Sequence, residues 1–421
     1  MSATALTSRP APPRRRALGA LRHRNYRLFL GGQLVSTIGT WMQSLAQPWL
    51  VLQLTHSAFL VGLVLALQYL PVLGLAPIGG LIADRFPKRR VLQLTQAAFM
   101  VPALFLFIVS WTGVVTYWMV LLAALAWGLV QLVDVPTRQA FAVEMVGRED
   151  LMNAIALNSS VWNAAAVIGP ALAGVVIAFL GVPICFLINA VSYLAVIGGL
   201  ALMRNLPTLL PDLARQPLQQ RMMEGARYVR RDPVVGAMLI VVGVFSLFAM
   251  NRLTLMPLFA EDVLHVGAVG FGLLMGSLGL GSLMGALTLA LVAPQPSGRR
   301  QFWVGVCWAL ALLGFSFSRL LALSMALLFV AGSCQMWFLA TANTRIQTAT
   351  PDRLRGRVMA FYAQAVMGVA PLGATQAGAL ASFVGAPAAM AVGAAIAGLV
   401  IVGIRVVWPS VFTLEPSELV A

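Results

Sequence analysis

The chain has 421 residues, of which 60% are hydrophobic and 10% are charged, and its formal net charge is +15. A mean hydropathy of +0.88 excludes a soluble domain, because a fold of this size cannot hide so much apolar surface from water. We therefore expect the bilayer to be its solvent, and the placement of the basic residues must decide whether their charge indicates nucleic-acid binding.

Long apolar segments follow one another along the chain. A helix that spans a bilayer needs about 20 apolar residues. The sequence therefore predicts an all-α membrane protein with twelve transmembrane helices. The predicted spans are residues 28–51, 58–82, 91–111, 117–137, 153–179, 183–203, 234–257, 268–292, 302–318, 321–343, 358–382 and 386–408.

The basic residues follow the predicted topology. With the N-terminus in the cytoplasm, every Lys and Arg except Arg252 and Arg319 falls in a cytoplasmic segment or at the adjoining helix end. Cytoplasmic loops of membrane proteins carry such an excess. The pattern predicts a multi-pass inner-membrane protein with both termini in the cytoplasm, and it argues against a nucleic-acid partner.

The predicted spans divide into two groups of six around a polar stretch. The predicted domains are a basic cytoplasmic tail (1–27), an N-terminal six-helix bundle (28–203), a central cytoplasmic linker (204–232), a C-terminal six-helix bundle (233–408) and a cytoplasmic C-terminal tail (409–421). Within the linker, residues 221–231 form either an amphipathic helix along the inner membrane surface or a solvated connection. The three cysteines, Cys185, Cys307 and Cys334, lie far apart in sequence inside predicted helices and indicate neither a disulfide framework nor a metal site.

Polar residues recur on one face of the first span. They follow one another at steps of three and four residues, so we expect them to face the bundle interior. This face consists of Gln33, Thr37, Thr40, Ser44 and Gln47. A second such face, on the fourth span, consists of Trp127, Gln131 and Asp134.

A tight charged turn joins the second and third spans, over residues 80–90. A carboxylate such as Asp84 is favoured near the N-terminus of a neighbouring helix, and basic residues hold the turn in the cytoplasm. We expect a conformational gate formed by Gly80, Asp84, Arg85, Arg89 and Arg138.

Asp134 is expected to lie inside the membrane. An ionised Asp at the centre of a spanning helix costs about 2.5–3.5 kcal/mol on insertion scales, so it needs a partner, water or a proton. Arg138 follows one helical turn later. Asp134 is therefore either a proton carrier or part of an ionic lock with Asp84 and Arg138. Arg252 either pairs with Glu261 or Asp262, or extends to the membrane surface, or contacts an anionic substrate.

The two halves resemble each other around 134–139 and 343–347, where Arg138 and Arg345 take equivalent places. Such repeats are typical of transporters in which one half moves against the other. The turn at 80–90 resembles the loop between helices 2 and 3 of the major facilitator superfamily, although Pro87 stands where that family usually has Gly. Residues 25–29, 39–43, 136–141 and 355–359 resemble the branch that includes the enterobactin exporter and drug and macrolide efflux proteins.

The resemblance implies a central cavity lined by helices 1, 4, 7 and 10. Beyond the two polar faces above, it adds Ser246, Met250, Asn251, Ser333, Met336 and Trp337 as cavity candidates. The fifth span carries Gly169, Pro170 and Gly174, similar to the helix-5 motif of proton-linked antiporters, with Ala165 and Ala173 in place of two glycines. Close packing alone also accounts for those small residues.

These features predict a secondary active transporter, functional as a monomer, that exports a small amphipathic drug, macrolide or siderophore by proton antiport with alternating access. We expect the proton gradient to supply the energy without a cofactor, because the sequence has no nucleotide-binding loop. No nucleophile is paired with a base, so we do not expect an enzyme. Two alternatives remain: a metabolite importer or facilitator, and a non-transporting membrane sensor.

Overall fold

The computed structural model describes residues 19–147, 149–204, 218–292 and 297–413. These residues form helices joined by short turns, with no strand among them. The predicted all-α fold is confirmed.

The first half consists of long helices between short connections. Its elements are η1 (Gly19–Arg22), α1 (Arg24–Thr55), α2 (Ala58–Arg85), α3 (Lys88–Trp111), α4 (Tyr117–Val146), α5 (Leu151–Leu180) and α6 (Val182–Ala201). Gly147 and Gly181, with φ of 71° and 85°, follow α4 and α5. A positive φ at this place is easy for glycine and ends a helix.

The second half is more irregular, because short π-helical segments interrupt its helices. Its elements are α8 (Pro233–Val244), η2 (Phe245–Ala249), α9 (Arg252–Leu258), η3 (Phe259–Val263), α10 (Gly267–Val292), α11 (Gly298–Phe317), α12 (Leu321–Ala349), α13 (Asp352–Ala363), η4 (Gln364–Gly368), α14 (Ala370–Val407) and α15 (Ser410–Thr413). Gly385, with φ of 82°, separates two helices within α14.

By length and composition, nine helices of the described ranges could cross a membrane. The run from Leu354 to Val407 counts as one of them, although the kink at Gly385 divides it. The twelve-helix count therefore stays a prediction.

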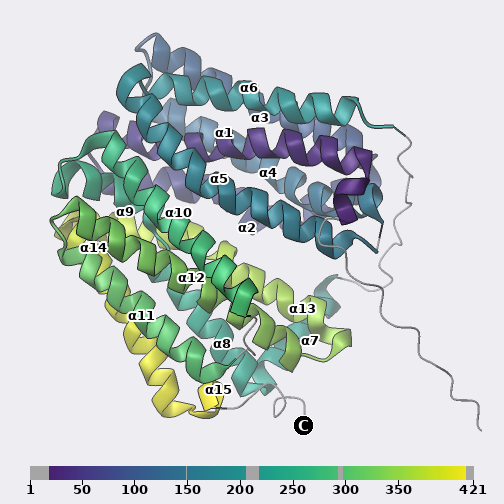
Figure 1. The fold of residues 1–421 in the computed structure, drawn as a ribbon, viewed down its shortest axis with the longest axis vertical. Coiled ribbons are helices and arrows are strands. Elements are labelled where there is room, and N and C mark those ends of the chain that lie inside the picture. The colour runs from purple at the N-terminus through teal and green to yellow at the C-terminus, as the bar shows by residue number, and fades with distance from the viewer. Residues whose placement is uncertain (1–18, 148, 205–217, 293–296, 414–421) are drawn as a thin grey trace, which may run out of the picture.

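The helices gather into two bundles (Figure 1). In the picture α1–α6, purple to teal, lie above the green and yellow helices of the second half. α1 packs against α5 and α6, while α3 packs against α4 and α6. In the second half α12 lies between α10 and α11, and α11 also contacts α14.

The halves meet along two helix pairs, α2 with α14 and α5 with α10. We call this interface between the halves the seam. Glycines allow this approach: a Cβ on Gly62 would lie 2.3 Å from the Ala374 oxygen, and one on Gly378 would lie 2.6 Å from the Ala58 oxygen. We call the end at which α1 begins and α2 ends the basic end, after the basic turn at 85–90. Because α2 begins at Ala58, these contacts close the seam at the opposite end.

Toward the basic end, α5 is uncovered. Asn158, Ser159 and Ser160 are consecutive and all exposed. Leu157 packs against the first half, but three consecutive residues span more than half of the circumference of a helix, so the second half does not cover this part of α5. The seam is therefore closed at the opposite end and open along α5 toward the basic end.

Helix α7 (Leu218–Arg231) precedes the second bundle. Of the two alternatives predicted for this stretch, a helix and a solvated connection, the structure has the helix. An ion pair joins Glu224 to Arg357 on α13. The Tyr228 hydroxyl donates to the backbone oxygen of Ala349, 2.9 Å away. Burial, together with the nearby Asp232 carboxylate, raises the pKa of Tyr228 to about 12. α7 is thus attached to the second half, and Arg227, Arg230 and Arg231 on it are exposed.

Candidate transport site

Asp134 is held in a closed polar cluster between α3 and α4. Its Oδ1 accepts hydrogen bonds of 2.8 Å from Thr95 Oγ1 and from Gln96 Nε2. Its Oδ2 accepts from Arg138 Nε at 3.1 Å and Nη2 at 2.5 Å. Asp134 is 3% exposed, so these donors replace water around the carboxylate.

The basic turn next to this cluster is fixed to neighbouring helices. Lys88 forms an ion pair of 2.7 Å with Glu144 on α4, and Arg89 Nη2 donates to the Ala201 oxygen at 2.8 Å. Arg85 is exposed, and a Cβ on Gly80 would meet nothing within 4 Å. Asp84 ends up in the last turn of α2, but its side chain is outside the described part of the structure. Within the described residues, the predicted ionic lock therefore consists of Asp134 and Arg138.

The polar face of α1 packs within its own half. Asn189 on α6 donates from Nδ2 to Gln43 Oε1 at 2.7 Å, and Thr40 contacts Asn189 Oδ1 at 3.5 Å. Ser44 Oγ donates to the Thr40 oxygen. The remaining predicted members of this face, Gln33, Thr37 and Gln47, are buried. Gln43 is not one of the predicted members of this face; of those, Thr40 contacts α6 through Asn189, and the predicted contact of the face with a substrate remains a prediction.

The face on α4 also lies within the first half. Trp127 is buried, and its ring is 5.5 Å from that of Phe99 and 6.4 Å from that of Tyr69. Gln131 is half-buried. Trp127 therefore contributes to the aromatic core.

The helix at 233–263 breaks in its interior. Met250 and Asn251 lie outside the helices, between η2 and α9, and Asn251 Nδ2 donates to the Leu247 oxygen at 2.7 Å. Ser246, in η2, is buried. Breaks of this kind occur in transporters where backbone lines a cavity. The break brings Arg252 to the seam between the halves.

A cavity of about 230 Å³ lies at this seam. The first half contributes residues of α1 and α5, and the second half contributes Arg252 and residues of α10 and α12. The lining consists of Trp41, Trp162, Asn163, Ala166, Arg252, Met275, Leu278, Gly279, Ser282, Gln335, Met336 and Leu339. Gln335 is the central residue of α12, so the cavity lies midway along that helix.

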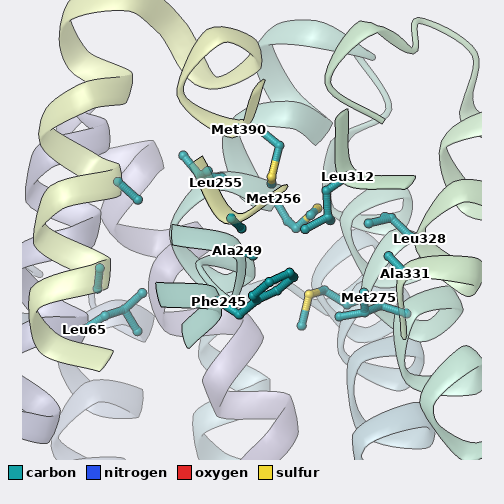
Figure 2. Close-up of a cluster of buried hydrophobic side chains, with 14 of the residues drawn as sticks. Leu65, Phe245, Ala249, Leu255, Met256, Met275, Leu312, Leu328, Ala331 and Met390 are labelled. Carbon is teal, nitrogen blue, oxygen red and sulfur yellow. The ribbon is translucent and has the colours of Figure 1, made fainter. Parts of the chain in front are cut away.

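A smaller space of about 10 Å³ adjoins it, and Arg252, Leu278 and Gln335 line both. The wall of this space is apolar and sulfur-rich. Figure 2 shows Met256, Leu312 and Met390 close together, with Phe245 and Ala249 nearby. This packing closes the smaller space on the side of Arg252 that belongs to the second half.

Among the cavity candidates from the seventh and tenth predicted spans, Met336 lines the larger cavity and Met250 lines the smaller one. Ser333 Oγ instead donates to the Gly281 oxygen at 2.9 Å, and Trp337 Nε1 donates to Thr288 Oγ1 at 2.9 Å. Both bonds join α12 to α10. Those two side chains hold helices of the second half together.

The small residues of α5 permit close helix contacts. A Cβ on Gly169 would lie 2.5 Å from Trp41 Cβ, and one on Gly174 would lie 2.9 Å from the Ala268 oxygen. Across the seam, a Cβ on Gly272 would lie 2.7 Å from the Pro170 oxygen. The motif thus packs α5 against α1 and α10, whatever further role it has.

The predicted ion pair of Arg252 with Glu261 or Asp262 is not formed. Those two carboxylates line a separate cavity of about 340 Å³ with Trp49, Gln53 and His56. The π-helical segment η3 carries them away from Arg252. Among the described residues, no hydrogen bond or ion pair reaches the Arg252 side chain.

Sequence reasoning missed several residues of the site. Trp41 was seen only as part of a family motif, and Trp162, Asn163 and Gln335 were not singled out. A lone polar residue such as Gln335 in an apolar span was the available signal. Thr95 and Gln96 carried no signal, because their role depends on how α3 packs against α4.

A family model described as transmembrane secretion effector matches residues 16–419. The staphyloferrin A transporter of Staphylococcus aureus is 26% identical over 356 residues, which cover 82% of this chain and 86% of that protein. The enterobactin exporter EntS of Citrobacter koseri is 26% identical over 388 residues, covering 91% of each chain.

Solved structures share the fold. A bacterial homologue of the iron transporter ferroportin, in an inward-facing state, aligns with a TM-score of 0.70 at 16% identity, over 90% of this chain and 98% of that one. A bacterial homologue of the lysosomal transporter Spinster, inward-facing and unoccupied, aligns with a TM-score of 0.70 at 13% identity, over 92% and 96%.

Proposed function

Because the chain belongs to the transmembrane secretion effector family of the major facilitator superfamily, whose members are transporters, we propose that it exports a small amphipathic molecule by proton antiport. Siderophores are the first candidates, since the two relatives named above are a siderophore transporter and a siderophore exporter. Drugs and macrolides are the other candidates. The protein works as a monomer in the inner membrane, with the proton gradient as its energy source.

One observation carries this proposal: the cavity at the seam takes its lining from both halves. Alternating access requires a site between the two halves, so that rocking them exposes it first to one side of the membrane and then to the other. A cavity within one half would stay on one side of that motion.

The basic end faces the cytoplasm in this proposal, because Lys and Arg are retained on that side. The uncovered part of α5 then faces the cytoplasm, and the contacts of Gly62 and Gly378 close the outer side. This is the state in which an exporter takes up its substrate.

Asp134 has two possible roles in the transport cycle, and its contacts favour the lock. The carboxylate is buried, contacts three donor side chains and does not line the cavity at the seam. A proton carrier needs access to water, which these contacts exclude. Asp134 therefore orients Arg138 at the basic end.

Reconstitution in liposomes that carry a pH gradient tests the proposal. Siderophores, macrolides and cationic dyes are added one at a time, and the gradient is followed with a pH-sensitive dye. We expect at least one compound to collapse the gradient in wild-type vesicles and not in empty ones. Collapse that persists in Asp134→Asn supports the lock, whereas its loss moves the coupling proton to Asp134. Uptake that is unaffected when the gradient is removed would contradict antiport and favour a facilitator.

A further inference from the structure

Arg252 is a cation inside the membrane region, at the seam between the halves. It lines both adjoining cavities together with Leu278 on α10 and with Gln335, which lies midway along α12. A charged side chain at this depth is costly, and such residues commonly mark substrate or ion pathways. The presence of a cation at this position therefore needs an explanation.

The described residues provide no counter-charge for Arg252. Neither cavity is lined by an Asp or Glu, and the carboxylates next along the chain, Glu261 and Asp262, line a different cavity. Tyr69 is a titratable neighbour of Arg252, but a phenol is uncharged at neutral pH and supplies no counter-charge. Arg252 is half-buried, and a partly buried cation without a partner is unfavourable, so an anion that enters the cavity gains the interaction that the described residues leave unmade.

A second donor of the cavity lining also lacks an acceptor. Trp41 is buried, and its indole N–H has no hydrogen-bond partner within the described ranges. Buried donors of this kind are normally satisfied. Arg252, which has no hydrogen bond or ion pair within the described ranges, is the donor of this lining that a ligand with acceptors would satisfy.

The rest of the lining is mostly apolar and aromatic, with Asn163, Ser282 and Gln335 as its polar members. The rings of Trp41 and Trp162 meet edge to face with centroids 5.5 Å apart, and Met275 and Met336 lie on the second-half side. The volume of about 230 Å³ is below the roughly 300–1,000 Å³ of sites for drug-sized ligands, so the cavity as seen holds one part of such a molecule.

We infer that Arg252 binds a carboxylate or similar anionic group of an amphipathic substrate, with an aromatic or apolar part of that substrate against Trp41 and Trp162. The inference rests on the proposed function, because it assigns the substrate class of the same cavity. It distinguishes acidic amphipathic molecules from the cationic dyes and neutral macrolides that the fold alone admits.

Binding to the purified protein in an uncharged detergent tests the inference without any flux. The probes are 1-naphthoate, its uncharged counterpart naphthalene-1-carboxamide, and inorganic phosphate, each titrated by calorimetry. We expect wild type to bind naphthoate at least about tenfold more tightly than the carboxamide, with phosphate weaker than naphthoate. Arg252→Gln should bind both ring compounds equally, whereas Arg252→Lys should retain part of the preference.

Arg319→Gln is the matched control, because Arg319 is the other basic residue outside the basic segments and donates to the Ser316 and Ser318 oxygens. It should keep the full preference. Thermal unfolding of Arg252→Gln reports on its folding, and removal of an unpaired cation should leave its midpoint unchanged or raised.

Equal binding of the ring compounds by wild type, binding of neither, or a preference that survives in Arg252→Gln would overturn the anion site. Phosphate binding as tight as that of naphthoate would overturn the amphipathic class. The liposome assay separates the two proposals: a naphthoate preference without movement of any compound supports the site and contradicts transport, and movement without the preference does the reverse.

Discussion

The Arg138 guanidinium donates from both Nε and Nη2 to Oδ2 of Asp134, one turn earlier on α4. The two residues form a charged pair that Thr95 and Gln96 complete from α3. The equivalent place in the second half has a different arrangement: Arg345 donates to Gln301 Oε1 and to the Val411 oxygen. The repeat preserves the arginine and changes its partners.

Asp134→Asn should destabilise the protein, because it removes the charge that Arg138 contacts while keeping the size of the side chain. The Arg138 side chain is 28% exposed, so we expect a loss of about 1–3 kcal/mol, the cost of an unsatisfied buried group. The thermal unfolding midpoint in detergent measures it. Asp150→Asn, which affects the more exposed pair with His23, should change the midpoint less. Asp134→Asn with Arg138→Gln should recover stability; no recovery would show that the pair is not the cause.

Arg345→Lys should also destabilise the protein. The planar guanidinium reaches acceptors on α11 and after α14 at once, 2.9 Å from Gln301 Oε1 and 2.6 Å from the Val411 oxygen. An ammonium cannot reproduce this geometry, and a hydrogen bond to a charged group contributes about 1.5–3 kcal/mol. Thermal unfolding should show a lower midpoint for Arg345→Lys than for the exposed control Arg299→Lys. Equal midpoints would assign Arg345 no bridging role.

The predicted spans largely coincide with helices of the structure, because long apolar segments determine them with little help from tertiary contacts. The exceptions are 234–257, which breaks at Met250 and Asn251, and 358–382, which breaks at Val369. Asp134 and Arg138 were also predicted as a pair, since residues four apart on a helix face each other. Local spacing was sufficient for both.

The cavity could not be predicted in the same way. Gln33, Thr37 and Gln47 of the polar face of α1 are buried, and Thr40 contacts Asn189 on α6. Arg252 lines the cavity at the seam directly after the break at Met250 and Asn251, and no proline or glycine stands at those two positions to indicate a break. Which interior a side chain faces depends on how the two halves pack, which no single helix encodes.

Alkaline pH should weaken the attachment of α7. The pKa of Tyr228 is raised to about 12 in the folded protein from an ordinary value of 10, so the unfolded chain loses this proton first. Stability is therefore unaffected below pH 10 and falls as the pH rises from 10 toward 12. Tyr228→Phe should lower the unfolding midpoint at neutral pH, because it loses the bond to the Ala349 oxygen. It should also show a smaller decline between pH 10 and 12, and an equal decline in both proteins would assign the pH effect to other groups.

Closure of the seam at the end opposite the basic turn depends on glycine at position 378. A Cβ there would lie 2.6 Å from the Ala58 oxygen, too close for any real contact, and backbone on α2 cannot move aside cheaply. Gly378→Val should therefore separate α14 from α2 and favour the state open at that end. Gly403→Val is the matched control, since a Cβ on Gly403, in the second helix of α14 beyond Gly385, would meet nothing within 4 Å. A cysteine at Ala58 measures the change through its rate of reaction with a membrane-impermeant maleimide in sealed vesicles. We expect faster labelling with Gly378→Val and the parent rate with Gly403→Val, because only the first change forces the two helices apart. Unchanged labelling in Gly378→Val would mean that the seam tolerates the added methyl groups, and the glycine contact would then not control which end is closed.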